Sequence, residues 1–496
     1  MYWLLFMLSV SYWYCLPVVS TSIFGYTEFR GYDFLLLAIG LNLCLKHSAK
    51  MAHFFQADTS GRWLLRFCFW ATIMTLVTVF LCGLDRNFTH IGVVSMSLFH
   101  LWGFSLAYAA FHIFVQRRQQ CLQFLDGFLL VGLVEATIIC LQSVHLLPDF
   151  WNERYDIYGN MVFSGTLGKN RTLPGHMMVL ILPVALSYAH NRRIVGNARL
   201  VLALIAAAFA VTALMASGSR TAWLVGLVFA VATVLRGKKP LQTLLFGAII
   251  AAALSFLMPK ELSGSIHDMY DYKVTGHLAT VKSNDAVDKF QSIDAGRLEL
   301  WVGGILTLAH KPYVIPFGIG FCNYYKATHA GGGSAHNIYI TLIAELGVVG
   351  LYLYVKWLLA LWQQNSRLIS SKAGMSATER QLFKPTGMSP LLLALSVSLF
   401  GGEILYVFRP CFAFLGSFLF LCAILHHRAL VYGSKPRLSR RIGIFSPKGS
   451  FALPSGVSEI GKRGSSGYFV GPESQLLNKS HKPITVHRRR HSVKPR

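Results

Sequence analysis

Charged residues are scarce in this chain, and acidic residues most of all. Only 14% of its 496 residues are charged, with 21 Asp and Glu against 46 Lys and Arg. Soluble domains have about a quarter of their residues charged, so an ordinary soluble fold is excluded. The hydrophobic residues, 54% of the chain, fall into blocks of roughly 15 to 25, close to the length that crosses a bilayer. The sequence therefore predicts an all-α polytopic membrane protein of about twelve transmembrane helices.

Metal-binding and redox motifs are also missing. The nine cysteines include no CxxC pair and have no histidine at the spacing that a zinc site requires. The acids of the predicted loops contain no DxD-type metal motif. We therefore predict no metal and no other cofactor, and we interpret most of the cysteines as packing residues.

The first apolar block lacks the features of a secretory signal peptide. It has no basic n-region and no small-residue cleavage site, so we predict a retained helix over residues 2–20. Further spans are predicted at about 31–45, 63–84, 91–115, 125–146, 174–190, 199–216, 222–236, 241–258, 336–362, 388–408 and 411–432.

Basic residues gather in alternate connections between these spans. The second connection holds Lys46 and Lys50, and the fourth holds Arg117 and Arg118. Because cytoplasmic loops are enriched in Lys and Arg, we place the even connections and both termini in the cytoplasm. The long connection 259–335 is then extracytoplasmic.

The end of the chain is strongly basic. Fifteen Lys and Arg lie between Arg428 and Arg496, including the run Arg488–Arg490. This segment is rich in Gly, Ser and Pro and has too few apolar residues to form a core. We therefore divide the chain into a membrane body, 1–432, and a disordered cytoplasmic tail, 433–496, attracted to anionic membrane lipids. An RNA-binding tail is the weaker alternative, and no nucleic-acid partner is predicted.

Two short clusters on the extracytoplasmic side combine glycine with cations. The first runs from Gly165 to Arg171 and contains Lys169 and Asn170, so its backbone amides and cations could hold an anion. The second, Ser217 to Trp223, places Arg220 beside the N-terminus of a predicted helix, where the helix dipole also favours negative charge. Either cluster also fits an ordinary loop, with Arg220 reaching lipid headgroups.

A third cluster lies in the long connection. Arg297 is predicted to open a short amphipathic helix whose apolar face includes Trp301, Val302 and Ile305. The run Gly318–Gly320 then permits a tight turn. Arg297 could bind an anion, or it could pair with a neighbouring carboxylate.

The fourth element is His336-Asn337, which opens the tenth predicted span. A histidine at this position can accept a proton near neutral pH, although a lone interfacial histidine often has no chemical role. Glu345 lies nine residues after His336, about 180° round the helix and so on its opposite side. We therefore expect Glu345 to contact another helix, as we also expect of Glu135 and Glu403.

The order of these clusters along the chain and their shared extracytoplasmic side resemble the O-antigen ligase and polymerase superfamily. Its members are membrane glycosyltransferases that use undecaprenyl-diphosphate-linked glycans. The resemblance covers roughly Gly165 to Trp362. Its most specific parts are Gly218 to Trp223 and His336-Asn337 leading into Glu345 to Gly350.

The resemblance implies a GT-C-like fold in a bacterial inner membrane and a metal-independent transfer on the periplasmic side. By this resemblance, Arg220 and Arg297 hold the diphosphate and His336 activates the acceptor hydroxyl. The implied partners are the undecaprenyl-diphosphate-linked glycan and a lipid A-core acceptor. The implied substrate-binding residues are Lys169, Asn170, Arg171, Ser219 and Asn337.

One departure concerns the first cluster, where the family pattern looks like Gly-Asn-Pro-Asn. Here Lys169 and Arg171 replace both asparagines of that pattern. Within the superfamily we favour a ligase, because the main loop is compact, over a polymerase or a protein oligosaccharyltransferase. A secondary transporter or flippase is the alternative from another class, since membrane-embedded glutamates would suit it.

Overall fold

A computed structural model describes residues 1–23, 26–82, 88–150, 163–168, 172–236, 297–310, 312, 314–321, 324, 337–370, 383–398 and 412–427. Within these ranges, five helices are long and apolar enough to cross a membrane, and a sixth crossing results if the bent pair α2 and α3 is one span. The described part is therefore a helical, multi-pass membrane protein. The ninth predicted span, 241–258, lies outside the described residues. The predicted total of twelve spans therefore stays a prediction.

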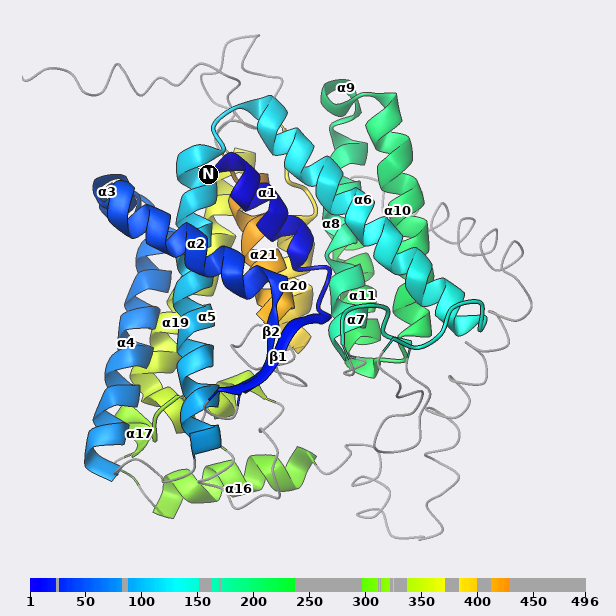
Figure 1. The fold of residues 1–496 in the computed structure, drawn as a ribbon. Coiled ribbons are helices and arrows are strands. Elements are labelled where there is room, and N and C mark those ends of the chain that lie inside the picture. Colours follow the sequence, from blue (N-terminus) through cyan, green and yellow to red (C-terminus); the bar gives the residue numbers. More distant parts are fainter. Residues whose placement is uncertain are drawn as a thin grey trace, which may run out of the picture. The chain divides into compact units, whose positions relative to one another are not determined.

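The described elements follow one another as α1 (Tyr2–Ser11), β1 (Pro17–Ile23), β2 (Tyr26–Arg30), α2 (Gly31–Lys46), α3 (Ser48–Ala57), α4 (Thr59–Cys82), α5 (Phe88–Phe114), α6 (Arg118–Ser143), α7 (Thr172–Val179), α8 (Ile181–His190), α9 (Arg192–Val195), α10 (Asn197–Ala216), α11 (Arg220–Arg236), α16 (Arg297–His310), α17 (Val314–Phe317), α19 (Ile338–Ser370), α20 (Met388–Ser398) and α21 (Phe412–Leu425) (Figure 1). Helices α2, α4, α5, α6, α10 and α11 lie close to predicted spans, and α7 with α8 fills the sixth. The chain separates into a unit of Met1–Pro436 and a unit of Arg437–Arg496. The second unit lies outside the described residues, so the tail 433–496 stays a prediction.

The prediction of one helix over 2–20 is wrong in its second half. α1 ends at Ser11, and the chain then forms β1, which pairs antiparallel with β2. Pro17 has no backbone N–H to donate within a helix, and the β-branched and hydroxyl residues that follow favour a strand. With 10 residues, α1 rises about 15 Å, half of the hydrocarbon thickness.

Helix α3 occupies a segment that the sequence analysis treated as a connection. It leaves α2 at an angle of 97°. Its Phe55 is buried, whereas Lys50 and His53 are exposed. α3 therefore lies across the end of the helical body and does not prolong the α2 span.

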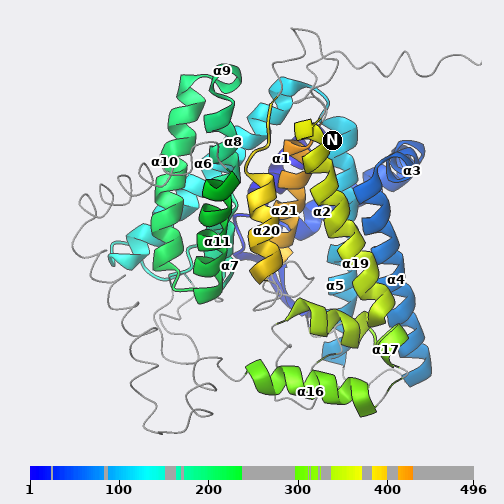
Figure 2. The ribbon, with the colours of Figure 1, turned by 180° about the vertical axis from the view of Figure 1, so that it is seen from behind.

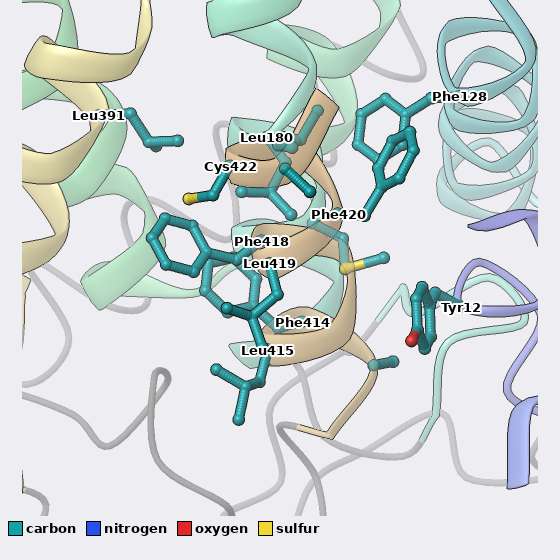
Figure 3. Close-up of a cluster of buried hydrophobic side chains, with 14 of the residues drawn as sticks. Tyr12, Phe128, Leu180, Leu391, Phe414, Leu415, Phe418, Leu419, Phe420 and Cys422 are labelled. Carbon is teal, nitrogen blue, oxygen red and sulfur yellow. The ribbon is translucent and has the colours of Figure 1, made fainter. Parts of the chain in front are cut away.

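The short helix α21 forms the centre of the described core. All of its 14 residues are buried, as expected for a helix that is apolar on every side. Figure 3 shows its side chains among Tyr12, Phe128 of α6, Leu180 and Leu391 of α20. Phe420 stacks on Phe128 of α6 with ring centroids 5.4 Å apart, and Gly416 allows the Tyr12 ring to lie directly against the α21 backbone.

Around this core, α10 packs against α6 and α8, α11 packs along α20, and α19 packs along α4 (Figure 2). These pairs position the segments that carry the predicted site.

Candidate functional site

The turn between α10 and α11 is held by its own hydroxyl groups. Ser217 Oγ donates to the Leu214 carbonyl oxygen over 2.8 Å, and Ser219 Oγ accepts from the Ala222 N–H over 3.3 Å. Ser219 is thus the N-cap of α11, and Arg220 is its first residue. A cation at this position stands at the positive end of the α11 dipole, so an anion bound here would be favoured by both.

The start of α7 lies directly against this turn. A Cβ added at Gly175 would come within 2.6 Å of Ala222 Cβ and 2.7 Å of Ser217 Oγ. Lys169, Asn170 and Arg171 lie outside the described residues, but they immediately precede Thr172, the first residue of α7. The chain therefore leads from the first predicted cluster into contact with the second.

The described part of the first cluster is anchored by a buried carboxylate. Thr166 donates to Glu135 through its N–H over 2.6 Å and through its hydroxyl over 2.9 Å. Gln142, also on α6, accepts from the Gly165 N–H over 2.8 Å. The hydrogen bonds of Glu135 thus go to this loop and not to the helix that the sequence analysis expected, because N–H groups of a loop need an acceptor whereas those inside a helix already have one.

Helices α11 and α19 begin at the same end of the body. The guanidinium carbon of Arg236, the last residue of α11, lies 4.9 Å from the ring centroid of Trp362 on α19. The first residues of the two helices, Arg220 and Ile338, therefore lie away from this contact, toward the other end of the body.

Helix α19 is broken one third of the way along, at Gly347, where φ is 70° and ψ is −177°. A break in a helix frees carbonyl groups that a buried backbone must satisfy elsewhere. The Ile319 N–H donates to the Ala344 carbonyl oxygen and the Gly320 N–H to the Glu345 carbonyl oxygen, both over 2.9 Å. The predicted Gly318–Gly320 turn is therefore docked into the break in α19.

The docking requires two glycines in contact with the opposing backbone. A Cβ on Gly347 would lie 2.2 Å from the Pro316 carbonyl oxygen, and one on Gly318 would lie 2.2 Å from the Glu345 carbonyl oxygen. Glu345 also accepts from the Tyr324 N–H over 3.1 Å. Glu345 thus binds a backbone N–H from the chain that follows the docked turn.

Helix α16 begins at Arg297, as predicted. Trp301 packs against the buried pair Tyr324 and Ala344, so α16 lies beside the first part of α19. Of the predicted apolar face, Val302 and Ile305 are exposed, a position that suits contact with lipid. The side chain of Arg297 is not among the described side chains.

Asn337 is buried and caps α19. Its Oδ1 accepts from the Tyr339 N–H over 3.0 Å and from the Ile340 N–H over 3.3 Å. His336 and Glu403 both lie outside the described residues. His336 immediately precedes the cap.

The structure thus brings the starts of α7, α11, α16 and α19 to one end of the body (Figures 1 and 2). Among the site residues predicted from sequence, it describes Ser219, Arg220 and Asn337 in full and Arg297 by its helix position. The anchoring of Thr166 by Glu135 was not predicted, because the two residues are 31 positions apart. Among the described residues no group of three or more His, Cys, Asp or Glu could hold a metal ion.

The profile of the O-antigen ligase family matches residues 205–355. This segment of the chain is therefore similar to the O-antigen ligase family. The match begins in α10 and ends within α19, so it includes the Ser219-Arg220 turn, α16 and the docked break. No curated protein matches the chain.

Proposed function

We propose that the chain is an O-antigen ligase, transferring a glycan from undecaprenyl diphosphate to a hydroxyl of lipid A-core on the periplasmic side of the bacterial inner membrane. The observation that carries this proposal is the family match across the segment whose helix starts converge at one end. A lipid-linked donor enters from the membrane, and a site at helix ends near the interface suits it.

In the proposed reaction, an oxygen of the acceptor attacks the anomeric carbon of the donor glycan. The bond from that carbon to the diphosphate oxygen breaks, and undecaprenyl diphosphate leaves with the electron pair. His336 takes the proton of the acceptor hydroxyl. Arg220 and Arg297 stabilise the negative charge that develops on the leaving diphosphate, so the proposed transfer needs no metal.

The other candidate residues have supporting roles. Lys169 and Arg171 add positive charge beside the start of α7, and Asn170 binds polar groups of the donor. Ser219 caps α11 and so places the Arg220 backbone, while Asn337 caps α19 directly after His336. The caps position two reacting groups on rigid helix starts.

The test is transfer by the purified full-length protein, with undecaprenyl-diphosphate-linked glycan, rough lipopolysaccharide and EDTA. Arg220→Ala, Arg297→Ala and His336→Ala should each lower transfer to lipopolysaccharide by about 100-fold, the cost of removing one such stabilising group. Arg193→Ala is the matched control, because Arg193 is an exposed arginine on α9, away from the helix starts.

Each other product has a distinct meaning. Elongation of the carrier-linked glycan without transfer to lipopolysaccharide would identify a polymerase of the same superfamily. Transfer that stops with EDTA and returns with a divalent ion would refute metal independence. Glycan movement across proteoliposomes without any new glycosidic bond would identify a transporter or flippase.

A further inference from the structure

Four side chains on the outer face of α4 and α19 form a continuous series of cation and ring contacts. The Arg66 guanidinium carbon lies 4.6 Å from the Trp63 ring centroid. Trp63 meets Tyr352 edge to face, with centroids 6.1 Å apart, and the Lys356 ammonium lies 5.4 Å from the Tyr352 centroid. We call these four residues the cation–ring patch.

The patch is accessible, and its cations are not neutralised by acids. Tyr352 is 51% exposed, and Arg66 is exposed as well. Among the residues that the structure describes, neither Arg66 nor Lys356 has a carboxylate within ion-pair distance. Both positive charges are therefore available to an anion.

An apolar strip leads away from the patch on one side. On α4 it follows the spacing of one helix face, which directs these residues to the same side. From Phe69 to Phe80 the strip rises about 16 Å, which matches one leaflet of the hydrocarbon core. The exposed residues of the strip are Phe69, Ile73, Leu76 and Phe80 on α4 and Val348 and Val349 on α19.

On its other side the patch borders polar groups. Gln364 of α19 donates to Asp58 at the start of α4 over 2.9 Å, and Arg62 donates to the Gln56 carbonyl oxygen over 2.8 Å. The patch therefore marks the boundary between a lipid-facing surface and a polar surface. Trp and Tyr favour this depth in a bilayer.

We propose that the cation–ring patch binds an anionic glycerophospholipid of the cytoplasmic leaflet. The lipid phosphate lies between Arg66 and Lys356, and an acyl chain lies along the apolar strip. Arginine matches the geometry of phosphate oxygens, and lysine adds a second positive charge. The cytoplasmic leaflet follows from the nearby exposed cations Lys46 and Lys50.

A lipid at this position would join α4 to α19. The two helices already share a hydrogen bond in which Trp70 Nε1 donates to the Leu346 carbonyl oxygen, over 2.8 Å, at the break in α19. Bound lipid should therefore raise the thermal stability of the protein as its concentration rises. The inference does not depend on the proposed transfer reaction.

The test is native mass spectrometry of the full-length protein in detergent, titrated with dioleoyl phosphatidylglycerol or dioleoyl phosphatidylcholine. The wild-type protein should bind phosphatidylglycerol more tightly, and the double variant Arg66→Gln/Lys356→Gln should weaken that binding by about tenfold. The control is Lys46→Gln/Lys50→Gln, which removes the same charge from exposed positions outside the patch. It should bind like the wild type.

One further variant and a competitor complete the design. Lys356→Arg should retain binding, because it keeps the cation over the Tyr352 ring, and the melting temperature without lipid shows whether each variant is folded. Equal binding of both lipids by the wild type, or equal loss in the control, would overturn the proposal. Displacement of the lipid by an equal concentration of soluble glycerol phosphate would overturn it too, since the site would then recognise phosphate alone.

Discussion

Replacing Gly347 with alanine should undock the loop that carries α17 and the Gly318–Gly320 turn. At φ 70° and ψ −177° the backbone of Gly347 occupies a region that is essentially restricted to glycine. The added methyl group would also meet the Pro316 carbonyl oxygen at 2.2 Å and the Phe317 nitrogen at 2.6 Å. Both atoms belong to backbone, so the contact cannot be relieved by a side-chain rotation.

The expected magnitude follows from what the docked state would lose. The unfavourable backbone conformation costs about 2 kcal/mol for a residue other than glycine. The contact with the Pro316 and Phe317 backbone adds to this cost. The docked state should thus be destabilised by about 2 kcal/mol or more, which lowers the docked-to-undocked ratio by about 30-fold or more.

Hydrogen exchange of the Ile319 and Gly320 amides measures this change directly. In Gly347→Ala both amides should exchange at least about 30-fold faster than in the wild type, and transfer to lipopolysaccharide should fall with them. Gly40→Ala is the control, because the added methyl would meet only the flexible Leu106 side chain, at 3.4 Å, within a regular helix. Unchanged exchange in folded Gly347→Ala would refute the assigned role of the break.

Three further predictions concern the anchors of the site. Glu135→Leu should lower the free energy of unfolding by about 2 kcal/mol, because it leaves the buried Thr166 N–H without an acceptor, while the Thr166 hydroxyl can still donate to the Trp13 carbonyl oxygen. Glu135→Gln should recover part of this loss in thermal denaturation. Ser219→Ala should cost about 1 kcal/mol of stability through the lost N-cap and lower transfer less than Arg220→Ala does. Asn337→Asp should keep the melting temperature, since a carboxylate oxygen also caps a helix, yet lower transfer by repelling the diphosphate; unchanged transfer would limit Asn337 to capping.

Long apolar runs made most helix positions predictable. α10 and α11 begin and end within about two residues of the predicted spans, because a change from polar to apolar sequence coincides with each end. The strand β1 was not predicted, since the apolar character of Val18 and Val19 suits a helix and a strand equally.

The candidate site was predictable where one short segment contains the signal. Arg220 and Arg297 are first residues of helices, as expected. Contacts between distant segments were not predictable, because sequence shows which residues are polar but not which acceptor each donor reaches. The glycines of the docked loop were visible in the sequence, whereas the carbonyl groups of α19 that they approach were not.

The break in α19 also bears on the choice between enzyme and transporter. Transporters often coordinate ions with the backbone carbonyl groups that a discontinuous membrane helix exposes, and α19 is discontinuous beside Glu345. Here the carbonyl oxygens of Ala344 and Glu345 accept from the docked loop, and that of Leu346 accepts from Trp70. A carbonyl engaged in this way is a poor ion ligand, so the break serves to seat the loop beside the start of α19, which favours the proposed enzyme over a transporter.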